Sequence, residues 1–580
     1  MNDCAFVVNM GQSLGGTMQI KELIRPEVMK NGTQSRPSLN LVVNFILSLL
    51  FLTAISTACC AQDKDKDKDL SWEALSQQYE VPAWFTEARF GIWVHWGAQT
   101  VPELGGGWYA RHLYMEDVGR EKFGRNARPY HLEHFGHPSV KGFKDVIHQW
   151  KAENLDTDSL MQYFTEDLGA KYFMALAHHH DNFDNWDSTH QEWNSVNVGP
   201  KRDIIGEFSV SAKKFGVPFG VTTHDARFFR WGLSAFGADT KGEFKGVPYD
   251  GHLTKADGAG LWWEGLDPVN LYGLPPEQRT PEWIEAWKQN WLLRMKELIT
   301  KYEVDYLWFD GRGYPYGDYG KEAFRTFYND SLKEHGKINA VIAGKIPGGA
   351  PGIVHDIEQG VESSISSDPW QSICTYTHWF YKKDDDLRHD AKSTIQLLID
   401  VASKNGNFVL NVELLPDGTI PADHKEILDD FGAWLKLHGE SIYATSAWNI
   451  HGDNLESRLA DADSKDANAA NSDLGAAERK KSKQFNNRTK DSPAYGHEEV
   501  RFTIKDDVMY VFVLNPSAGE IQLPSLGLKS PNEPKQIQSI TMIGSEAEIQ
   551  FSQTDDQLTL NVPAERPTEY AAVFKVIGAF

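Results

Sequence analysis

Asp310 is the residue whose surroundings point most directly to chemistry. It follows the largely apolar run 304–309, which is typical of a buried strand and too short for a helix, and Gly311 follows it. An Asp before a Gly at a strand end often only closes a turn or caps a helix. Here Trp308 and Phe309 provide a partly apolar wall that can hold a carboxylate in place. We therefore predict that Asp310 is a reactive carboxylate at the end of a strand.

Three other short apolar segments also end in polar side chains. They are the runs 91–94 before His95, 172–177 before His178, His179, His180 and Asp181, and 219–223 before His224 and Asp225. In an α/β barrel the carboxyl ends of the strands converge on one mouth, where active sites lie. The four segments together predict one pocket rich in His, Asp and Trp.

The order of the predicted elements indicates an α/β fold, a (β/α)8-like barrel, followed by an antiparallel β-sandwich. Between Trp72 and about His451 short apolar strands alternate with helical patterns, and after residue 496 only short alternating strands remain. The predicted divisions are a leader 1–61, a charged linker 62–80, a catalytic barrel 81–452 with an aromatic-rich insertion 230–280, a linker 453–495 and a sandwich 496–580. The insertion is expected to overhang the mouth, because long ordered loops in compact domains are usually functional.

Predicted helix boundaries support the barrel. Thr280 before Pro281 is a favourable helix start, and Asp390 is a suitable cap for a second helix that stops at Gly406. A third helix is expected from Pro421 to Gly439. Each carries its apolar residues on one face, as the outer helices of a barrel require.

The composition excludes some partners. The net charge is -23 and the pI is near 5.3, whereas a protein that binds nucleic acid needs a basic surface. The same charge disfavours an anionic membrane. The 19 Trp and 20 Tyr are compatible with packing against the apolar faces of sugar rings, although most buried aromatic residues are simply core.

The N-terminal residues predict export. Arg36 precedes the mostly apolar run 39–56, and small residues with Cys59 and Cys60 follow before the alternating Asp-Lys tract 63–69. This order is that of a signal peptide, and Cys59 loosely fits a lipoprotein cleavage box. A membrane anchor is the alternative interpretation. We expect an exported protein that is periplasmic, extracellular or an outer-membrane lipoprotein, with Cys374 as its other remaining cysteine.

The histidine cluster is open to several interpretations. Alternation along a strand would place His178 and His180 on one face and His179 on the other, unless the strand has already ended. A His-x-His pair at a barrel mouth can hold Zn²⁺ in hydrolases, but the first strand offers only His95. Hydrogen bonding to a polyhydroxyl substrate and a structural role are the other interpretations.

A glycosidase would need a second carboxyl group besides Asp310. The two lie about 5 to 5.5 Å apart when one is a nucleophile, and about 6.5 to 9.5 Å apart when a water fits between them. Candidates follow in the segment that contains Asp356 and Glu358, and near Asp368. Spacing alone does not choose among them.

Several motifs, in this order, resemble glycoside hydrolase family twenty-nine, the α-L-fucosidases. They cover about Trp84 to Trp448 and the C-terminal sandwich. They are Trp-Phe at 84–85, Ala-Arg-Phe-Gly-Ile at 88–92, His-Trp-Gly at 95–97, Gly-Gly-Trp-Tyr at 106–109, His-His-Asp at 179–181, Trp-Asn-Ser-Val at 193–196, Gly-Pro-Lys-Arg-Asp at 199–203, Trp-Phe-Asp-Gly at 308–311, Pro-Trp-Gln at 369–371 and Ser-Lys-Asn-Gly-Asn at 403–407.

The resemblance implies a retaining exo-glycosidase that uses two carboxylates and no cofactor or metal. It implies that Asp310 is the nucleophile and that the residues of the fucose pocket are His95, Trp108, His179, His180 and Trp308. We add His224 and Trp370 as expected substrate contacts.

The acid/base is less clearly marked. One branch of the family carries a Glu where this chain has Gly107, and the other carries a Glu that resembles Glu358, although Gln359 replaces an expected Arg. Thr222, Thr223 and His224 replace a Tyr-Tyr-Ser of many relatives.

The prediction is therefore removal of terminal α-L-fucose, with retention, from a fucosylated oligosaccharide or polysaccharide. Two alternatives stay open: a divalent-metal hydrolase that uses the His178–His180 cluster, and a carbohydrate-binding protein that has lost catalysis, which Gly107 motivates.

Overall fold

The computed structural model describes residues 69–119, 124–224, 227–346, 349–455 and 489–580. The predicted leader 1–61, residues 62–68 of the charged linker, Asp225 and residues 456–488 of the second linker lie outside the described residues. Among the helices that the model does describe, none combines the length and the apolar character that a membrane crossing requires.

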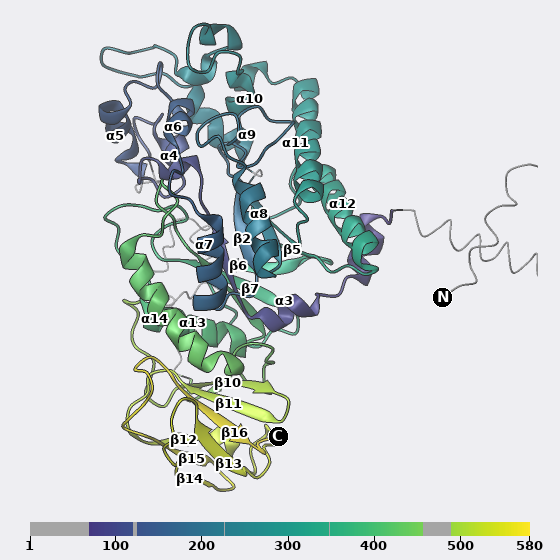
Figure 1. Cartoon of the computed structure of the whole chain (residues 1–580), viewed down its shortest axis with the longest axis vertical. Coiled ribbons are helices and arrows are strands. Elements are labelled where there is room, and N and C mark those ends of the chain that lie inside the picture. Colours follow the sequence, from purple (N-terminus) through teal and green to yellow (C-terminus); the bar gives the residue numbers. More distant parts are fainter. Residues whose placement is uncertain (1–68, 120–123, 225–226, 347–348, 456–488) are drawn as a thin grey trace, which may run out of the picture. The chain divides into compact units, whose positions relative to one another are not determined.

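A closed barrel of parallel strands forms the larger part of the fold (Figure 1). Each strand pairs with the next in sequence, and β1 pairs with β8, with Gly91 opposite Val409. This confirms the predicted fold class. The strands are β1 (Phe90–Val94), β2 (Phe173–His178), β3 (Phe219–Thr223), β4 (Tyr306–Phe309), β5 (Val341–Gly344), β6 (Val354–Glu358), β7 (Trp370–Thr375) and β8 (Gly406–Asn411).

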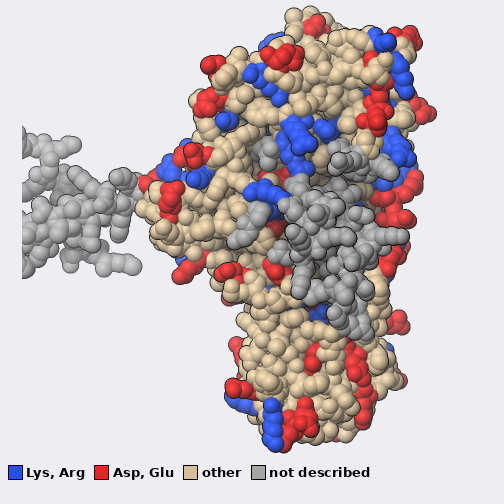
Figure 2. Space-filling view, turned by 180° about the vertical axis from the view of Figure 1, so that it is seen from behind, with Lys and Arg blue, Asp and Glu red and all other residues tan. Residues whose placement is uncertain are grey.

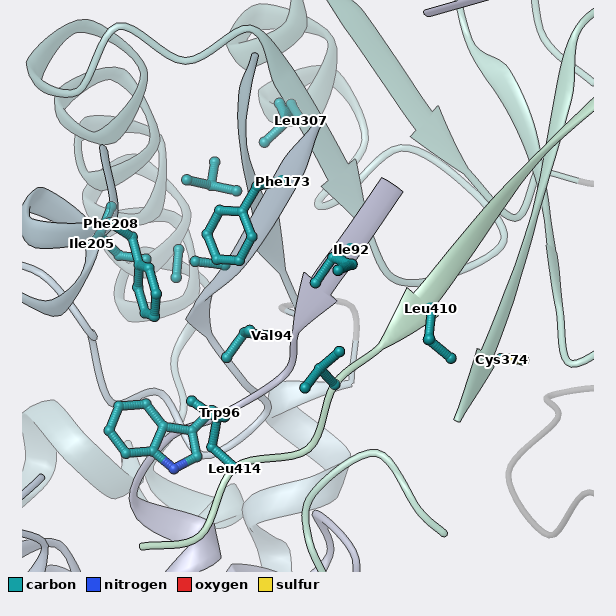
Figure 3. Packing of buried hydrophobic residues seen from close by; sticks show 14 of the residues in the cluster. Ile92, Val94, Trp96, Phe173, Ile205, Phe208, Leu307, Cys374, Leu410 and Leu414 are labelled. Carbon is teal, nitrogen blue, oxygen red and sulfur yellow. The ribbon is translucent and has the colours of Figure 1, made fainter. Parts of the chain in front are cut away.

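Buried side chains fill both faces of the barrel wall. On the outer face, Figure 3 shows Phe173 beside Phe208 of α8 (Ile204–Phe215), and their rings lie 5.0 Å apart. Inside the barrel a second apolar cluster includes Trp93, Tyr306 and Trp308. Because successive residues of a strand point to opposite faces, strands buried on both sides are almost wholly apolar.

Helices cover the outside of the barrel, and three of them begin where predicted. The side chain of Thr280 accepts a hydrogen bond from Trp283 N at the start of α11 (Pro281–Lys301), and that of Asp390 accepts one from Ser393 N at the start of α13 (Ala391–Ser403). The third is α14 (Ala422–His438). The others are α2 (Trp72–Gln78), α3 (Ala83–Ala88), α4 (Tyr109–His112), α5 (Ala127–His134), α6 (Phe143–Gln149), α7 (Thr157–Gln162), η4 (Tyr163–Asp167) and α12 (Asp318–His335).

The insertion 230–280 is ordered by a buried ion pair. Lys144 Nζ lies 3.0 Å from Asp250 Oδ2, and both side chains are fully buried. The hydroxyls of Tyr114 and Tyr272 donate to the same carboxylate at 2.7 and 2.9 Å. The segment contains the end of α9 (Phe228–Trp231), α10 (Pro268–Tyr272) and the short turns η5 (Gly232–Phe236), η6 (Asp250–His252), η7 (Lys255–Gly258) and η8 (Pro276–Gln278).

The C-terminal region consists of two antiparallel sheets, in the orders β13-β16-β11-β10-β9 and β12-β15-β14. These sheets confirm the short alternating strands that the sequence predicts after residue 496. Arg501 of β10 pairs with Asp400 of α13 at 2.6 Å. The strands are β9 (Gly452–Asp453), β10 (Val500–Lys505), β11 (Val508–Val513), β12 (Gly519–Leu523), β13 (Ser539–Met542), β14 (Phe551–Gln553), β15 (Leu558–Val562) and β16 (Ala572–Ile577).

Candidate active site

A narrow pocket lies at the carboxyl ends of the barrel strands, and we call it the mouth pocket. Its side chains come from the ends of β1, β2, β3, β4, β5 and β6 and from the loops that follow, as expected for this fold. The lining residues are Trp93, His95, Trp108, His179, His180, His224, Arg227, Trp308, Asp310, Lys345, Glu358 and Trp379. Eight of the nine predicted site residues therefore come together.

Asp310 lies at the base of the mouth pocket, 4% exposed. Its backbone N–H donates to the carbonyl of Thr223 at 2.9 Å, which fixes the chain where it leaves β4. Burial alone would raise the pKa of Asp310, but the positive charges of Lys345 and Arg227, together with His180, outweigh burial and hold the pKa well below its usual range. Asp310 is therefore ionised at neutral pH.

Lys345, directly after β5, joins Asp310 to Glu358. Its Nζ lies 2.5 Å from Asp310 Oδ1 and 2.5 Å from Glu358 Oε2. Burial alone would lower the pKa of Lys345, yet the two carboxylates raise the pKa above its ordinary value. Because both oxygens contact one nitrogen, they lie at most about 5 Å apart, which suits the retaining arrangement of carboxyl groups.

Three imidazoles form the opposite side of the mouth pocket. One ring nitrogen from each of His95, His179 and His224 lies within 4.8 Å of the others, and all three residues are buried. Burial, together with neighbouring positive charge, lowers the pKa of each well below its ordinary value. At neutral pH each ring is neutral and has one donor and one acceptor.

His178 is not part of this group. It is the last residue of β2, where the pairing with β3 shifts between Leu176 and His178. Its Nδ1 faces Asp184 at 3.8 Å. Because the strand ends there, the predicted alternation does not continue, and His179 and His180 both face the mouth pocket. The His178–His180 pair that motivated a metal site is therefore not formed.

Indole rings form the walls. Trp93 lies 5.1 Å from Trp308 and 5.4 Å from Trp379, measured between ring centroids. The guanidinium of Arg227 lies over Trp108 at 5.8 Å. Such walls suit the apolar face of a sugar ring, while the imidazoles suit its hydroxyls.

Trp370 is the predicted site residue that the structure does not bring to the mouth pocket. It is the first residue of β7, paired with Gly406 at the start of β8, so it lies at the other end of the strands. Its Nε1 donates to the carbonyl of Lys404 at 2.9 Å. This buried tryptophan packs between strands, and we withdraw it as a substrate contact.

The sequence interpretation also missed Trp93, Arg227, Lys345 and Trp379. The sequence could have indicated Lys345 as a site residue, because it directly follows a short apolar strand, as Asp310 does.

Gly107 is a position where the structure requires glycine. Its φ is +99°, and a Cβ there would lie 2.7 Å from the ring of Phe380. The left-handed backbone and the close ring both oppose a side chain. This loop position does not accommodate an acid/base side chain without rearrangement. Among the described residues that line the mouth pocket, Glu358 is the carboxyl group beside Asp310.

Two carboxyl groups at the mouth of a barrel are the pair that hydrolysis of a glycosidic bond uses in most glycoside hydrolases. The α-L-fucosidase family model matches residues 55–440, and the model of the α-L-fucosidase C-terminal domain matches residues 495–577. The chain belongs to the α-L-fucosidase family, and it is a glycoside hydrolase that removes terminal α-L-fucosyl residues from fucosylated glycans.

Individual relatives agree with this assignment. The chain is 27% identical to the human tissue α-L-fucosidase over 428 residues, which cover 72% of this chain and 80% of the relative. It is 24% identical to the α-L-fucosidase of Dictyostelium discoideum over 418 residues, 71% and 79% of the two chains. The fold is similar to that of Thermotoga maritima α-fucosidase in complex with a mechanism-based inhibitor, with TM-score 0.61, 22% identity and coverage of 87% and 99%.

Buried histidines predict how stability depends on pH. Burial lowers the pKa to about 4 in His180, His378, His389, His424, His438 and His451. An unfolded imidazole binds its proton near pH 6.5, so each of these groups contributes stability above that pH and loses it as pH falls toward 4.

Buried acids act in the opposite sense. Burial raises the pKa of Asp181 to about 6, of Asp356 to about 7 and of Glu413 to about 8, so each gains stability as pH falls. Six such histidines outnumber the three acids, so their loss of stability at low pH should outweigh the gain from the acids. We expect the thermal midpoint to fall by roughly 5 °C or more between pH 6.5 and 4.5. A calorimetric midpoint that stays level or rises over that interval would contradict this balance.

Proposed function

We propose that Asp310 is the nucleophile and Glu358 the acid/base of a retaining double displacement. The observation that supports this most is the Lys345 ammonium, 2.5 Å from an oxygen of each carboxylate. The spacing of at most about 5 Å leaves no room for a water between the carboxylates, as inversion would require. A nucleophile must also be ionised, and the lowered pKa of Asp310 meets that condition.

The first step forms a glycosyl-enzyme. An oxygen of Asp310 attacks the anomeric carbon while the bond to the leaving oxygen breaks, and Glu358 gives that oxygen a proton. In the second step Glu358 takes a proton from water, whose oxygen attacks the anomeric carbon, and the Asp310 carboxylate leaves. Two inversions restore the starting configuration.

Lys345 couples the two steps electrostatically. Before attack, the ammonium faces both Asp310 and Glu358. After attack Asp310 is a neutral ester, so Glu358 is the anionic partner that the ammonium keeps, and Glu358 is the group that the second step uses as a base.

The other side chains of the mouth pocket bind the sugar. His95, His179, His180 and His224 offer neutral ring nitrogens to hydroxyls. Trp108 and Trp308 offer apolar surface. On the face that Figure 2 shows, acidic and basic side chains are interspersed. Together with the net charge of -23, this supports our proposal that the protein has no nucleic-acid partner.

The test is the stereochemistry of hydrolysis. Proton NMR of an aryl α-L-fucoside with the purified protein should show α-L-fucose before mutarotation, at a rate that a chelator does not change. First formation of the β-anomer would refute the double displacement. Activity lost to the chelator and restored by Zn²⁺ would favour a metal hydrolase, and binding without turnover would favour a carbohydrate-binding protein.

We also propose that the protein is exported and that the mature chain begins within 59–62, acylated if Cys59 is used. The support is the sequence of the leader alone, since these residues lie outside the described part of the chain. Mass spectrometry of the protein from its native host should find no peptide from residues 39–56. Recovery of that segment intact would contradict export by cleavage.

A further inference from the structure

We propose that Gln99 is a positioning residue that fixes the proton of His179 on Nε2, so that this ring presents a donor to a sugar hydroxyl. The inference rests on the proposed function only for the identity of the acceptor. Gln99 lies in the turn η2 (Ala98–Thr100) just after β1, and its side chain is fully buried.

The amide of Gln99 has three partners. Its Nε2 lies 2.7 Å from Asp181 Oδ2 and 2.9 Å from His179 Nδ1. Its Oε1 accepts a hydrogen bond from the backbone N–H of Ala110 at 3.3 Å. Two donors and one acceptor are thus used, and no polar atom of the side chain is left without a partner.

These partners allow one orientation of the amide. Turning it over would place Oε1 against the carboxylate of Asp181 and the NH₂ group against the N–H of Ala110, so both contacts would become repulsive. The NH₂ group therefore faces His179. Nδ1 of His179 accepts its hydrogen bond, and a neutral ring with Nδ1 as acceptor carries its proton on Nε2.

His180 has the opposite arrangement. Its Nδ1 lies 2.6 Å from the carbonyl oxygen of His224, which can only accept, so Nδ1 carries the proton. Burial lowers the pKa of His180 to about 4, so its Nε2 is an acceptor at neutral pH. This atom lies 3.4 Å from Asp310 Oδ2, which also can only accept, so a hydroxyl that binds here donates its proton to this pair of acceptors. The two rings lie 4.6 Å apart and both line the mouth pocket.

The neighbouring histidines therefore offer a donor and an acceptor side by side. A sugar hydroxyl is itself both donor and acceptor, so it can accept from His179 and donate to His180. A site built in this way loses binding when one partner is reversed, because two donors or two acceptors then face each other. Gln99 therefore affects sugar binding through the tautomer of His179 and not through a contact of its own with the sugar.

The first test is Gln99→Glu, which keeps the size of the side chain but replaces the donor by an acceptor. The introduced carboxylate can only accept, so His179 then carries a proton on Nδ1, and in the neutral ring Nε2 turns a lone pair toward the mouth pocket. At pH 7.5 we expect kcat/KM for an aryl α-L-fucoside to fall at least about tenfold. This single variant also places the new carboxylate at position 99 beside that of Asp181, which lowers stability. Its loss of activity alone therefore does not distinguish a changed tautomer of His179 from a destabilised fold.

A double variant that combines Gln99→Glu with Asp181→Asn makes that separation. The amide introduced at position 181 can donate to the carboxylate introduced at position 99. It can still accept from Phe183 N, as Asp181 Oδ1 does at 3.1 Å, and the net charge is that of the wild type. The thermal midpoint should return to the wild-type value while kcat/KM stays low. Recovery of kcat/KM together with the midpoint would overturn the proposal and leave Gln99 a packing residue.

Nitrogen-15 NMR of ring-labelled histidine reads the tautomer without substrate. The wild type should show His179 protonated at Nε2, and both variants should show it protonated at Nδ1. An unchanged tautomer in the variants would overturn the proposal, whereas a wild type that shows the expected tautomer but does not cleave fucosides would count against the proposed function alone.

Discussion

Replacement of Asp310 by Asn is expected to reduce turnover of aryl and natural fucosides by a factor on the order of 10⁴, with the fold preserved. The carboxamide has nearly the shape of the carboxylate but cannot form the glycosyl ester. Loss of the anion also leaves Lys345 with one carboxylate partner, Glu358, instead of two. Steady-state kinetics and a circular dichroism spectrum of the purified variant provide the measurement.

Asp305 supplies a matched control at the other end of the same segment. Its carboxylate accepts a hydrogen bond from Phe219 N at 2.9 Å, and an Asn side chain can accept the same bond. Asp305→Asn should therefore keep kcat/KM within about threefold of the wild type, since it removes a charge away from the mouth pocket. Near wild-type turnover by folded Asp310→Asn would sink the assignment of the nucleophile.

Much of the fold was predictable because local and global signals agree. Apolar runs bounded by turn residues marked the barrel strands, and Thr280 and Asp390 marked helix starts by the hydrogen bonds that they make as caps. The prediction that His95 and Asp310 share a pocket followed from one rule, that parallel strands in a barrel end at the same mouth.

Trp370 shows where that reasoning fails. No strand was predicted around residue 370, and the point at which a strand begins decides which end of the barrel a side chain occupies. Trp370 is the first residue of β7 and therefore lies at the end away from the mouth. The partners of Lys345 could not be predicted either. Asp310 directly follows β4 and Glu358 ends β6, and the pairing of both strands with β5 brings these ends to either side of Lys345.

Gln99 illustrates a further limit. Nothing in its sequence neighbourhood marks it as important, because its effect depends on Ala110 and on the distant segment that contains His179 and Asp181. Sequence patterns identify groups that can react. They do not identify the hydrogen bonds that decide which tautomer a histidine adopts, and those require the folded geometry.

Glu358→Ala is the second change with a large expected effect, and it should depend on the leaving group. In a natural fucoside the leaving group is a sugar oxygen, which leaves as an alkoxide unless an acid protonates it. The kcat/KM of Glu358→Ala for natural fucosides should therefore fall by about 10³ or more. Aryl fucosides with acidic phenols need little protonation, and their first step should slow by only about tenfold. Glu362→Ala is the matched control, because Glu362 lines a separate cavity with His355 and Trp370. Its ratio of kcat/KM for natural fucosides to kcat/KM for aryl fucosides should equal that of the wild type.

Azide provides the decisive measurement on Glu358→Ala. This variant should accumulate the fucosyl-enzyme from an aryl fucoside, because no base remains to activate water. Azide needs no base, can enter the space that the side chain vacates, and attacks from the face opposite Asp310. The product should therefore be fucosyl azide with the α configuration of the substrate, and the rate should rise with azide concentration. Equal slowing of aryl and natural substrates without azide rescue would move the acid/base elsewhere, and Asp356, which shares β6, would be tested next.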